Sequence, residues 1–210
     1  GVESSEKEVL DSAKRKNLEN EKIFKLVNQI ERMGIMVKCN YILCLPGDSK
    51  EKHIQGVLNL IDAKITFILP YTLILLDGTE LGTKADRNRW DMRTKFRLNH
   101  RCFGSYEFGE NMLRCGEIEE VVVALDTLSF KDYLETRSFV LTASIFYVDN
   151  ILYELVEFLE HLGIKPSQLI MHIHERGESY FSSGLKELYK SFNSITKTEL
   201  WDDREALEHF

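Results

Sequence analysis

Two stretches of the chain carry polar groups where a ligand could bind. The first is Glu3-Ser-Ser5, a carboxylate at a strand-like end followed by two hydroxyls at the start of a helical pattern. The second is Tyr41-Ile-Leu-Cys-Leu-Pro-Gly-Asp-Ser49, an apolar run stopped by a Pro-Gly pair. It predicts a strand, a tight turn and a helix start, because Asp48 and Ser49 can cap free N–H groups. Ligands of α/β proteins bind at the carboxyl ends of strands, so both stretches are candidate binding edges.

Each stretch also has a plainer interpretation. The second fits an ordinary buried strand with a loop, and Glu3 fits simple helix capping. His172-x-His174 fits a metal pair on a strand, but residues two apart on a helix do not face each other. The remaining histidines read as isolated residues on polar surfaces or loops: His53, His100, His161 and His209. The four cysteines lack the spacing of an iron–sulfur motif: Cys39, Cys44, Cys102 and Cys115.

Hydrophobic periodicity predicts an α/β arrangement around these stretches. The predicted order is strand, helix pair, strand, helix and strand. The simplest fold with this order has parallel strands joined by helical crossovers. The apolar core of the second stretch is typical of a parallel strand covered on both faces. Ser5-x-x-Glu8 is a capping box, and Gly34 is a natural left-handed C-cap. The expected elements are helices over 6–15, 19–33 and from Ser49, and strands over 35–45 and 65–69.

The remainder of the chain divides into a polar segment and a helical one. Residues 82–118 read as irregular, with arginines among aromatic residues, which fits either nucleic-acid stacking or a loop packed by its aromatics over the mouth of a barrel. A short strand is expected at 121–125. From Ser129, whose Ser-x-x-Asp pattern is a capping signature, the periodicity is helical. It breaks near Asp149-Asn150 and resumes in helices from Pro166, over 183–192 and over 198–208.

Composition narrows the classes of function. The formal net charge of −7 argues against binding along a nucleic-acid backbone. No apolar run approaches the roughly 20 residues of a membrane helix, and unpaired cysteine spacing fits a reducing compartment, so we expect a cytoplasmic protein without membrane partners. The chain opens on Gly1 without a methionine, from which we expect that it was cut from something longer.

Taken together, these motifs resemble radical S-adenosylmethionine (SAM) enzymes. Gly1-Val-Glu-Ser4 and Lys14-Arg-Lys16 resemble the end of their fourth strand and the following helix. Tyr41 to Ser49 resembles the fifth strand, usually written Phe-Ile-x-Gly-Leu-Pro-Gly-Glu-Thr, and Gly78-Thr-Glu-Leu81 resembles the segment after the sixth. A weaker resemblance, over Glu117 to Val123 and Ser129 to Tyr133, is to the C-terminal extension of members with a cobalamin-binding domain.

The resemblance implies a partial (β/α) barrel that binds SAM and a 4Fe–4S cluster, with cobalamin as a further cofactor of the subgroup. The family's glutamate or serine near the ribose and methionine parts of SAM maps onto Glu3 and Ser4. Its fifth-strand wall against adenine maps onto four positions, with Asn40 adding a polar contact: Tyr41, Ile42, Leu45 and Pro46. Cys44 stands where the family usually has glycine.

The Cys-x-x-x-Cys-x-x-Cys motif that holds the cluster is not in this chain. The resemblance therefore implies the C-terminal half of such an enzyme, inert alone, whose partners are the N-terminal half of the same polypeptide and a small-molecule or lipid-like substrate. We divide it into a half-barrel over 1–75, a connecting segment over 76–128 and a helical extension over 129–210. The edge left free where the third strand belongs could form a homodimer. The alternative is a non-catalytic α/β scaffold with a helical protein-interaction domain.

Overall fold

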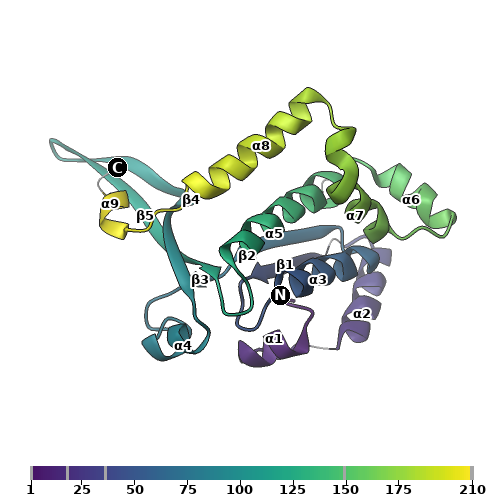
Figure 1. Cartoon of the computed structure of the whole chain (residues 1–210), viewed down its shortest axis with the longest axis horizontal. Helices are drawn as coiled ribbons and strands as arrows, with labels where there is room; N and C mark the ends of the chain where they lie inside the picture. The colour runs from purple at the N-terminus through teal and green to yellow at the C-terminus, as the bar shows by residue number, and fades with distance from the viewer. Residues whose placement is uncertain (1, 18, 36, 149, 209–210) are drawn as a thin grey trace.

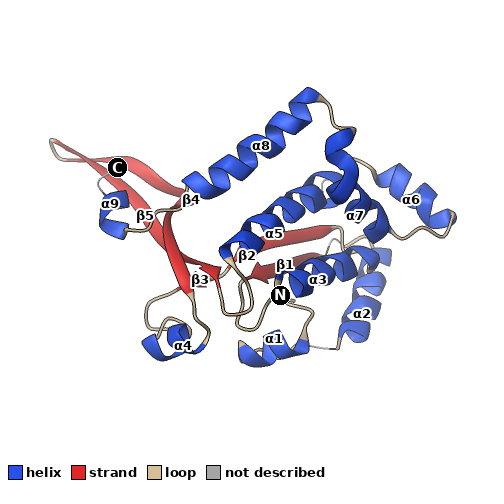
Figure 2. Cartoon of the chain, in the orientation of Figure 1, coloured by secondary structure: helices blue, strands red, loops and turns tan. Residues whose placement is uncertain are grey.

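The computed structural model describes residues 2–17, 19–35, 37–148 and 150–208 (Figure 1). The chain has a mixed α/β fold, in which a small parallel sheet and an antiparallel hairpin are combined with helices (Figure 2). A closed barrel is not formed by the described residues, whose two sheets have two and three strands. The expected α/β class is confirmed at this coarser level.

The parallel sheet consists of β1 (Lys38–Leu43) and β2 (Phe67–Thr72), joined by helix α3 (Lys50–Asp62). Their register places Lys38 opposite Phe67, so both strands end at the same edge. Two helices precede β1, namely α1 (Lys7–Ser12) and α2 (Asn20–Arg32), and Gly34 follows α2 with φ 75°, as its C-cap role predicts. The Ser5-x-x-Glu8 capping box is wrong, because α1 begins after Glu6 and has no side-chain cap.

The two faces of β1 differ. Cys39 and Tyr41 are buried in a core that also contains Ile61 of α3 and Phe139 of α5 (Phe130–Ala143). The other face of the sheet is not covered in the same way, since its side chains are exposed or half-buried: Lys38, Asn40 and Ile42 of β1 and Phe67, Leu69 and Tyr71 of β2. The expectation of a strand covered on both faces is therefore wrong for β1. We call this second side the open face.

The segment over 82–118 is not irregular. It holds α4 (Lys84–Arg89) and most of a long antiparallel hairpin of β4 (Arg93–Phe108) and β5 (Asn111–Ala124), which protrudes from the body (Figure 1). Polar and aromatic residues hide the strand period, but Gly109, with φ 62°, supplies the tight turn. The aromatic side chains are largely exposed and do not pack over a barrel mouth: Phe103, Tyr106 and Phe108.

The backbone of Leu73 forms hydrogen bonds with both sheets. The amide of Leu73 donates to the carbonyl of Leu43 at 2.9 Å, and the carbonyl of Leu73 accepts from the amide of Val122 at 2.9 Å. The short strand β3 (Ile74–Leu75) then pairs with β5. A second core forms at this junction, because Leu43, Val122 and Tyr133 are all buried in it. The carboxyl end of the parallel sheet therefore abuts the base of the hairpin.

The last third of the described chain is helical. After α5 come the π-helix η1 (Ser144–Val148), α6 (Tyr153–His161), α7 (Pro166–Arg176), the 3-10 turn η2 (Gly177–Ser179), α8 (Ser183–Thr198) and α9 (Arg204–Glu208). The capping box of Ser129 and Asp132 is confirmed. Asp62 at the end of α3 accepts from the amide and hydroxyl of Ser167, at 3.1 and 2.9 Å, so α7 is anchored to the α/β part.

No single helix of the described chain is both long and apolar enough to cross a membrane. One bent pair, Phe130–Val148 with Tyr153–His161, meets the criterion only when the two parts, which meet at 86°, are taken together.

Candidate functional site

The two stretches singled out in the sequence lie side by side. The amide of Glu3 donates to the carbonyl of Asn40 at 2.8 Å, and the amide of Ile42 donates to the carbonyl of Glu3 at 2.9 Å. This is a parallel bridge between Glu3 and Tyr41, so the N-terminal segment runs beside β1 in the same direction as β2. Glu3 has φ 53°, which turns the chain away from the strand at this point, and its carboxylate lies 3.3 Å from Nε of Arg15.

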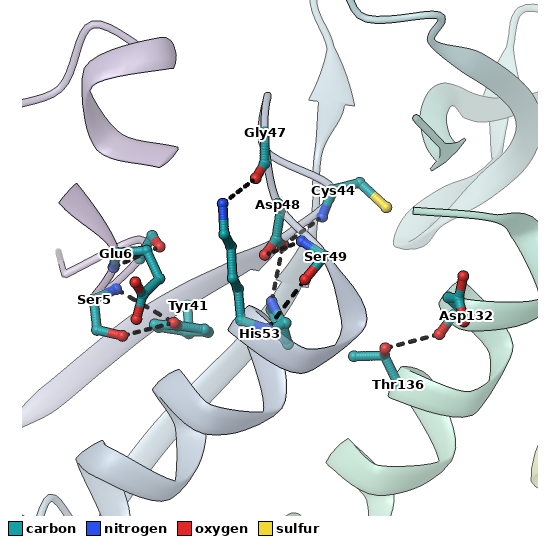
Figure 3. Close-up of polar contacts among 12 residues, drawn as sticks. Ser5, Glu6, Tyr41, Cys44, Gly47, Asp48, Ser49, His53, Asp132 and Thr136 are labelled. Carbon is teal, nitrogen blue, oxygen red and sulfur yellow. Dashed lines mark hydrogen bonds and ion pairs between the residues drawn. The ribbon is translucent and has the colours of Figure 1, made fainter. Parts of the chain in front are cut away.

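The hydroxyls after Glu3 are used inside the protein. The Oγ of Ser4 accepts from the amide of Glu6 at 3.1 Å. The amide of Ser5 donates to the Tyr41 hydroxyl at 3.2 Å, and the Ser5 hydroxyl lies 3.1 Å from the same oxygen (Figure 3). Burial raises the pKa of Tyr41, so its phenol is neutral and serves as a structural contact. Ser4 and Tyr41 therefore support the edge from the covered side.

Accessibility separates the other predicted residues. Asn40 is exposed and Ile42 is half-buried, both on the open face. Leu45 and Pro46 are buried, and Leu45 belongs to the second core. Of the seven predicted positions, Asn40, Ile42 and Glu3 are thus at least partly exposed, whereas Ser4, Tyr41, Leu45 and Pro46 are buried.

The turn after β1 is organised by the carboxylate of Asp48. Its Oδ2 accepts from the amide of Cys44 at 3.3 Å and lies 3.2 Å from Nδ1 of His53, and its Oδ1 accepts from the amide of Ser49 at 2.9 Å (Figure 3). Asp48 and His53 are both almost fully buried. The turn is therefore held by internal bonds, which gives the edge a fixed shape.

His53 was not expected to be buried. It lies on α3, and its ring meets that of Tyr41 edge-on at 4.8 Å. The interpretation of His53 as an isolated histidine on a polar surface is wrong, because the Asp48 carboxylate lets the imidazole be buried with a hydrogen-bond partner. The sequence signal that was missed is an aspartate just before a helix, five residues ahead of a histidine on the inner side of that helix.

Further contacts connect the turn to both sides. The Oγ of Ser49 accepts from the amide of Lys52 at 3.2 Å and so caps α3, as predicted. The ammonium of Lys52 donates to the carbonyl of Gly47 at 3.1 Å. The hydroxyl of Thr127, in the turn after β5, donates to the carbonyl of Asp48 at 2.5 Å. The turn is thus connected to the base of the hairpin, far away in the sequence.

Cys44 occupies a position that favours glycine. Its φ is 67°, in the left-handed region where a side chain is strained. Its side chain is fully buried in the second core, and burial together with the Asp48 carboxylate raises the pKa of the thiol well above its usual value. The backbone geometry thus gives a reason for a glycine preference here, and Cys44 adopts the same geometry with its thiol packed inward.

The described residues do not assemble a metal centre. No group of three or more His, Cys, Asp or Glu side chains in this part of the chain is arranged to hold a metal ion. Cys39 and Cys44 are buried as separate thiols, while Cys102 and Cys115 lie on the hairpin. His172 and His174 lie on helix α7 and not on a strand, where they are two positions apart. His209 falls outside the described residues.

No family model matches the chain, and no curated protein matches it either.

Proposed function

We propose that this chain contributes one wall of the SAM pocket in a radical SAM enzyme. The wall consists of the carboxyl edge of β1, with Glu3 on one side and β2 on the other. Asn40 and Ile42 face the adenine from the open face, and Glu3 lies near the ribose and methionine parts. The Asp48 turn supports the wall from behind.

The observation that carries this proposal is the parallel run of Glu3 beside Tyr41, with β2 on the other side of β1. Three consecutive parallel segments with helices between them are the repeating unit of a (β/α) barrel, and barrel enzymes bind their ligands at the carboxyl edge. The resemblance in sequence falls on this same edge. Two observations support the proposal. Glu3 lies beside β1, as the fourth-strand motif implies, and Cys44 has the left-handed backbone that suits the glycine of the fifth-strand motif.

The residues at this edge suit the adenosyl part of SAM. Adenine offers flat apolar faces and a polar rim, so its site needs apolar contact and hydrogen-bonding groups. Ile42 and the half-exposed Tyr71 provide apolar surface on the open face, and the Asn40 side chain provides an amide donor and acceptor. When bound at a reduced iron–sulfur cluster, SAM supplies a 5′-deoxyadenosyl radical in the enzymes that the chain resembles.

The residues present do not fit the cluster itself. The thiol of Cys39 has a pKa raised to about 11 by burial, and the thiol of Cys44 is also buried and protonated, whereas cluster ligands are thiolates. The described cysteines of this chain are therefore unsuited to hold a cluster. The cysteine ligands belong to the N-terminal half of the proposed enzyme, and the gene upstream of Gly1 should encode a Cys-x-x-x-Cys-x-x-Cys motif.

The direct test is an anaerobic assay of the full-length gene product with dithionite and SAM. The proposal predicts formation of 5′-deoxyadenosine, and a several-fold loss in Asn40→Ala, whose residue faces the proposed pocket. Asn88→Ala, an exposed substitution on α4, is the matched control and should keep full activity. If no 5′-deoxyadenosine forms and the upstream gene lacks the motif, the proposal is wrong.

A second candidate function is a protein-interaction scaffold without catalysis. It is favoured by helix α6, none of whose residues is buried, and by the exposed aromatic residues of the hairpin. The same assay separates the two functions, because a scaffold forms no 5′-deoxyadenosine.

A further inference from the structure

A cavity lies at the opposite end of the parallel sheet from the proposed SAM edge. Thr66 and Ile35, which precede β2 and β1, line one side of it, and Leu152 with α6 lines the other. Its volume is about 470 Å³. Sites for small organic ligands usually measure roughly 300–1,000 Å³, so the cavity is large enough for one such molecule.

The wall of the cavity is mainly apolar and aromatic. Phe146 and Tyr147 come from the π-helix, and Tyr153 and Val156 come from α6. Tyr147 is fixed by a hydrogen bond of 3.0 Å from its hydroxyl to the carbonyl of Ile61. Tyr147, which is buried, is therefore anchored to α3.

Three residues around the cavity have left-handed backbone angles, and two of them are not glycine. Gly34, Lys64 and Asn150 all line it, and all have left-handed backbone angles, with φ of 75°, 63° and 54°. Such angles are uncommon for residues other than glycine and cluster at functional sites. π-Helical turns, such as Ser144–Val148, also occur often at functional sites. Left-handed turns at Lys64 and Asn150 and a π-helix meet at this one cavity.

Helix α6 buries little of its side-chain surface against the rest of the protein. It has nine residues, none of them buried. Isolated helices shorter than about 12–15 residues are marginal in water, so α6 needs side-chain packing to persist. A molecule in the cavity would contact Tyr153 and Val156, and so would supply apolar contacts on the inner side of the helix.

The charges at the mouth favour a cation. The charged residues among the described lining are Lys64, Glu157 and Glu160. The Lys64 ammonium pairs with Glu160 at 2.9 Å. Glu157 makes no ion pair within the described residues, so its carboxylate remains for a ligand. One uncompensated carboxylate beside aromatic rings suits an ammonium group, through charge pairing and cation–π attraction.

We propose that this cavity binds a small hydrophobic amine, with an aromatic or alkyl body inside and its ammonium group at Glu157. The inference is independent of the proposed radical chemistry, because it uses none of the residues at the carboxyl edge. It assigns the π-helix and α6 a ligand-binding role.

The test uses tryptamine as the cation and indole-3-propionate as its anionic counterpart of similar shape. Methyl NMR of the chain labelled at Ile, Leu and Val reports binding at Ile35, Leu152 and Val156. We expect tryptamine to shift these signals with saturation, and indole-3-propionate to bind at least tenfold more weakly. Equal binding of the two compounds, or shifts confined to other methyl groups, would overturn the proposal.

Three variants sharpen the result. Glu157→Gln changes an exposed residue, leaves the fold intact and should weaken tryptamine binding about tenfold, the loss expected for one charge-assisted hydrogen bond. Val156→Trp fills the cavity and should abolish binding. Leu155→Trp, on the exposed side of the same helix, is the matched control and should bind normally. If Glu157→Gln binds tryptamine like the wild type, the assignment of the ammonium site is wrong.

Discussion

The amide of Cys44 donates to Oδ2 of Asp48 at 3.3 Å, across the Pro46-Gly47 turn. This bond holds Cys44 at φ 67° and directs the chain from the end of β1 into α3. The same carboxylate bonds Ser49 and lies against His53, so a single buried residue sets the shape of the edge where we propose that SAM binds.

Substitution of Cys44 tests the left-handed geometry. Cys44→Gly removes the strain of a side chain at φ 67° but also removes buried contacts, so its unfolding free energy should stay within about 1 kcal/mol of wild type. Cys44→Val adds β-branching to the strained conformation and should lose about 2 kcal/mol. Urea unfolding measures both. Equal stability of the two variants would contradict the left-handed assignment.

Asp48→Asn tests the carboxylate as the centre of the turn. The amide replaces one acceptor oxygen with a donor, which leaves a partner among Cys44, Ser49 and His53 unbonded in a buried place. We expect a loss of about 2 kcal/mol in unfolding free energy. Asp11→Asn, at an exposed position in α1, is the control and should change stability by less than about 0.5 kcal/mol. A similar small change in Asp48→Asn would show that its bonds contribute little.

The four thiols should differ in reactivity. Burial raises the pKa of Cys39 to about 11 and that of Cys44 well above its usual value, so neither forms thiolate readily in the folded protein. Cys102 and Cys115 are exposed, and a hydrogen bond with the Glu117 carboxylate raises the pKa of Cys102. Mass spectrometry after brief iodoacetamide treatment at pH 8 should find Cys115 modified fastest, then Cys102.

The two buried cysteines should be modified only in denaturant. Early labelling of Cys39 or Cys44 in the native protein would contradict the burial described above. Replacing Glu117 with Gln should raise the rate at Cys102 toward that at Cys115, because the pKa of the Cys102 thiol then falls.

The ion pair of Arg87 and Glu120 predicts a pH effect. Arg87 contacts both oxygens of Glu120, one at 2.7 Å, and its guanidinium lowers the pKa of Glu120 below 4.5 in the folded protein. The unfolded chain therefore takes up this proton first as pH falls. The pair stabilises the fold above about pH 4.5, and this contribution disappears as pH falls through the lowered folded pKa.

Urea unfolding of Glu120→Gln at pH 7 and pH 3.5 measures this contribution. The variant should be about 1–2 kcal/mol less stable than wild type at pH 7, and the difference should shrink at pH 3.5. Lys131, exposed in the ion pair with Glu135, provides a control, since Lys131→Gln should change stability little at either pH. A difference for Glu120→Gln that grows on acidification would contradict the assigned direction.

Much of the parallel part of the fold could be predicted from the sequence. The Pro46-Gly47 pair marks the end of β1, and Ser49 caps α3 as its position indicates. These signals are local, because turns and caps depend on a few neighbouring residues. The adjacency of Glu3 and Tyr41 also agrees with the order of strands and helices that the periodicity predicts.

The hairpin and the orientation of β1 could not be predicted in this way. β4 carries arginines and aromatic residues without a clear apolar alternation. Its strand conformation therefore depends on pairing with β5, which the sequence of β4 alone does not indicate. Tyr41 looks available for adenine in the sequence, but the contact of its hydroxyl with Ser5 fixes it on the covered face. His53 is likewise buried, because the Asp48 carboxylate five residues earlier gives its ring a hydrogen-bond partner and the Tyr41 ring packs against it.

The central claim is that SAM binds at the carboxyl edge of β1, and amide NMR of this chain titrated with SAM tests it most directly. The account predicts saturable shifts at Asn40, Ile42 and Gly47, with weaker binding in Asn40→Ala and unchanged binding in Asn88→Ala. Adenosine should shift the same amides, and uridine should not. Absence of shifts at these amides, or equal binding by both Asn variants, would contradict the account.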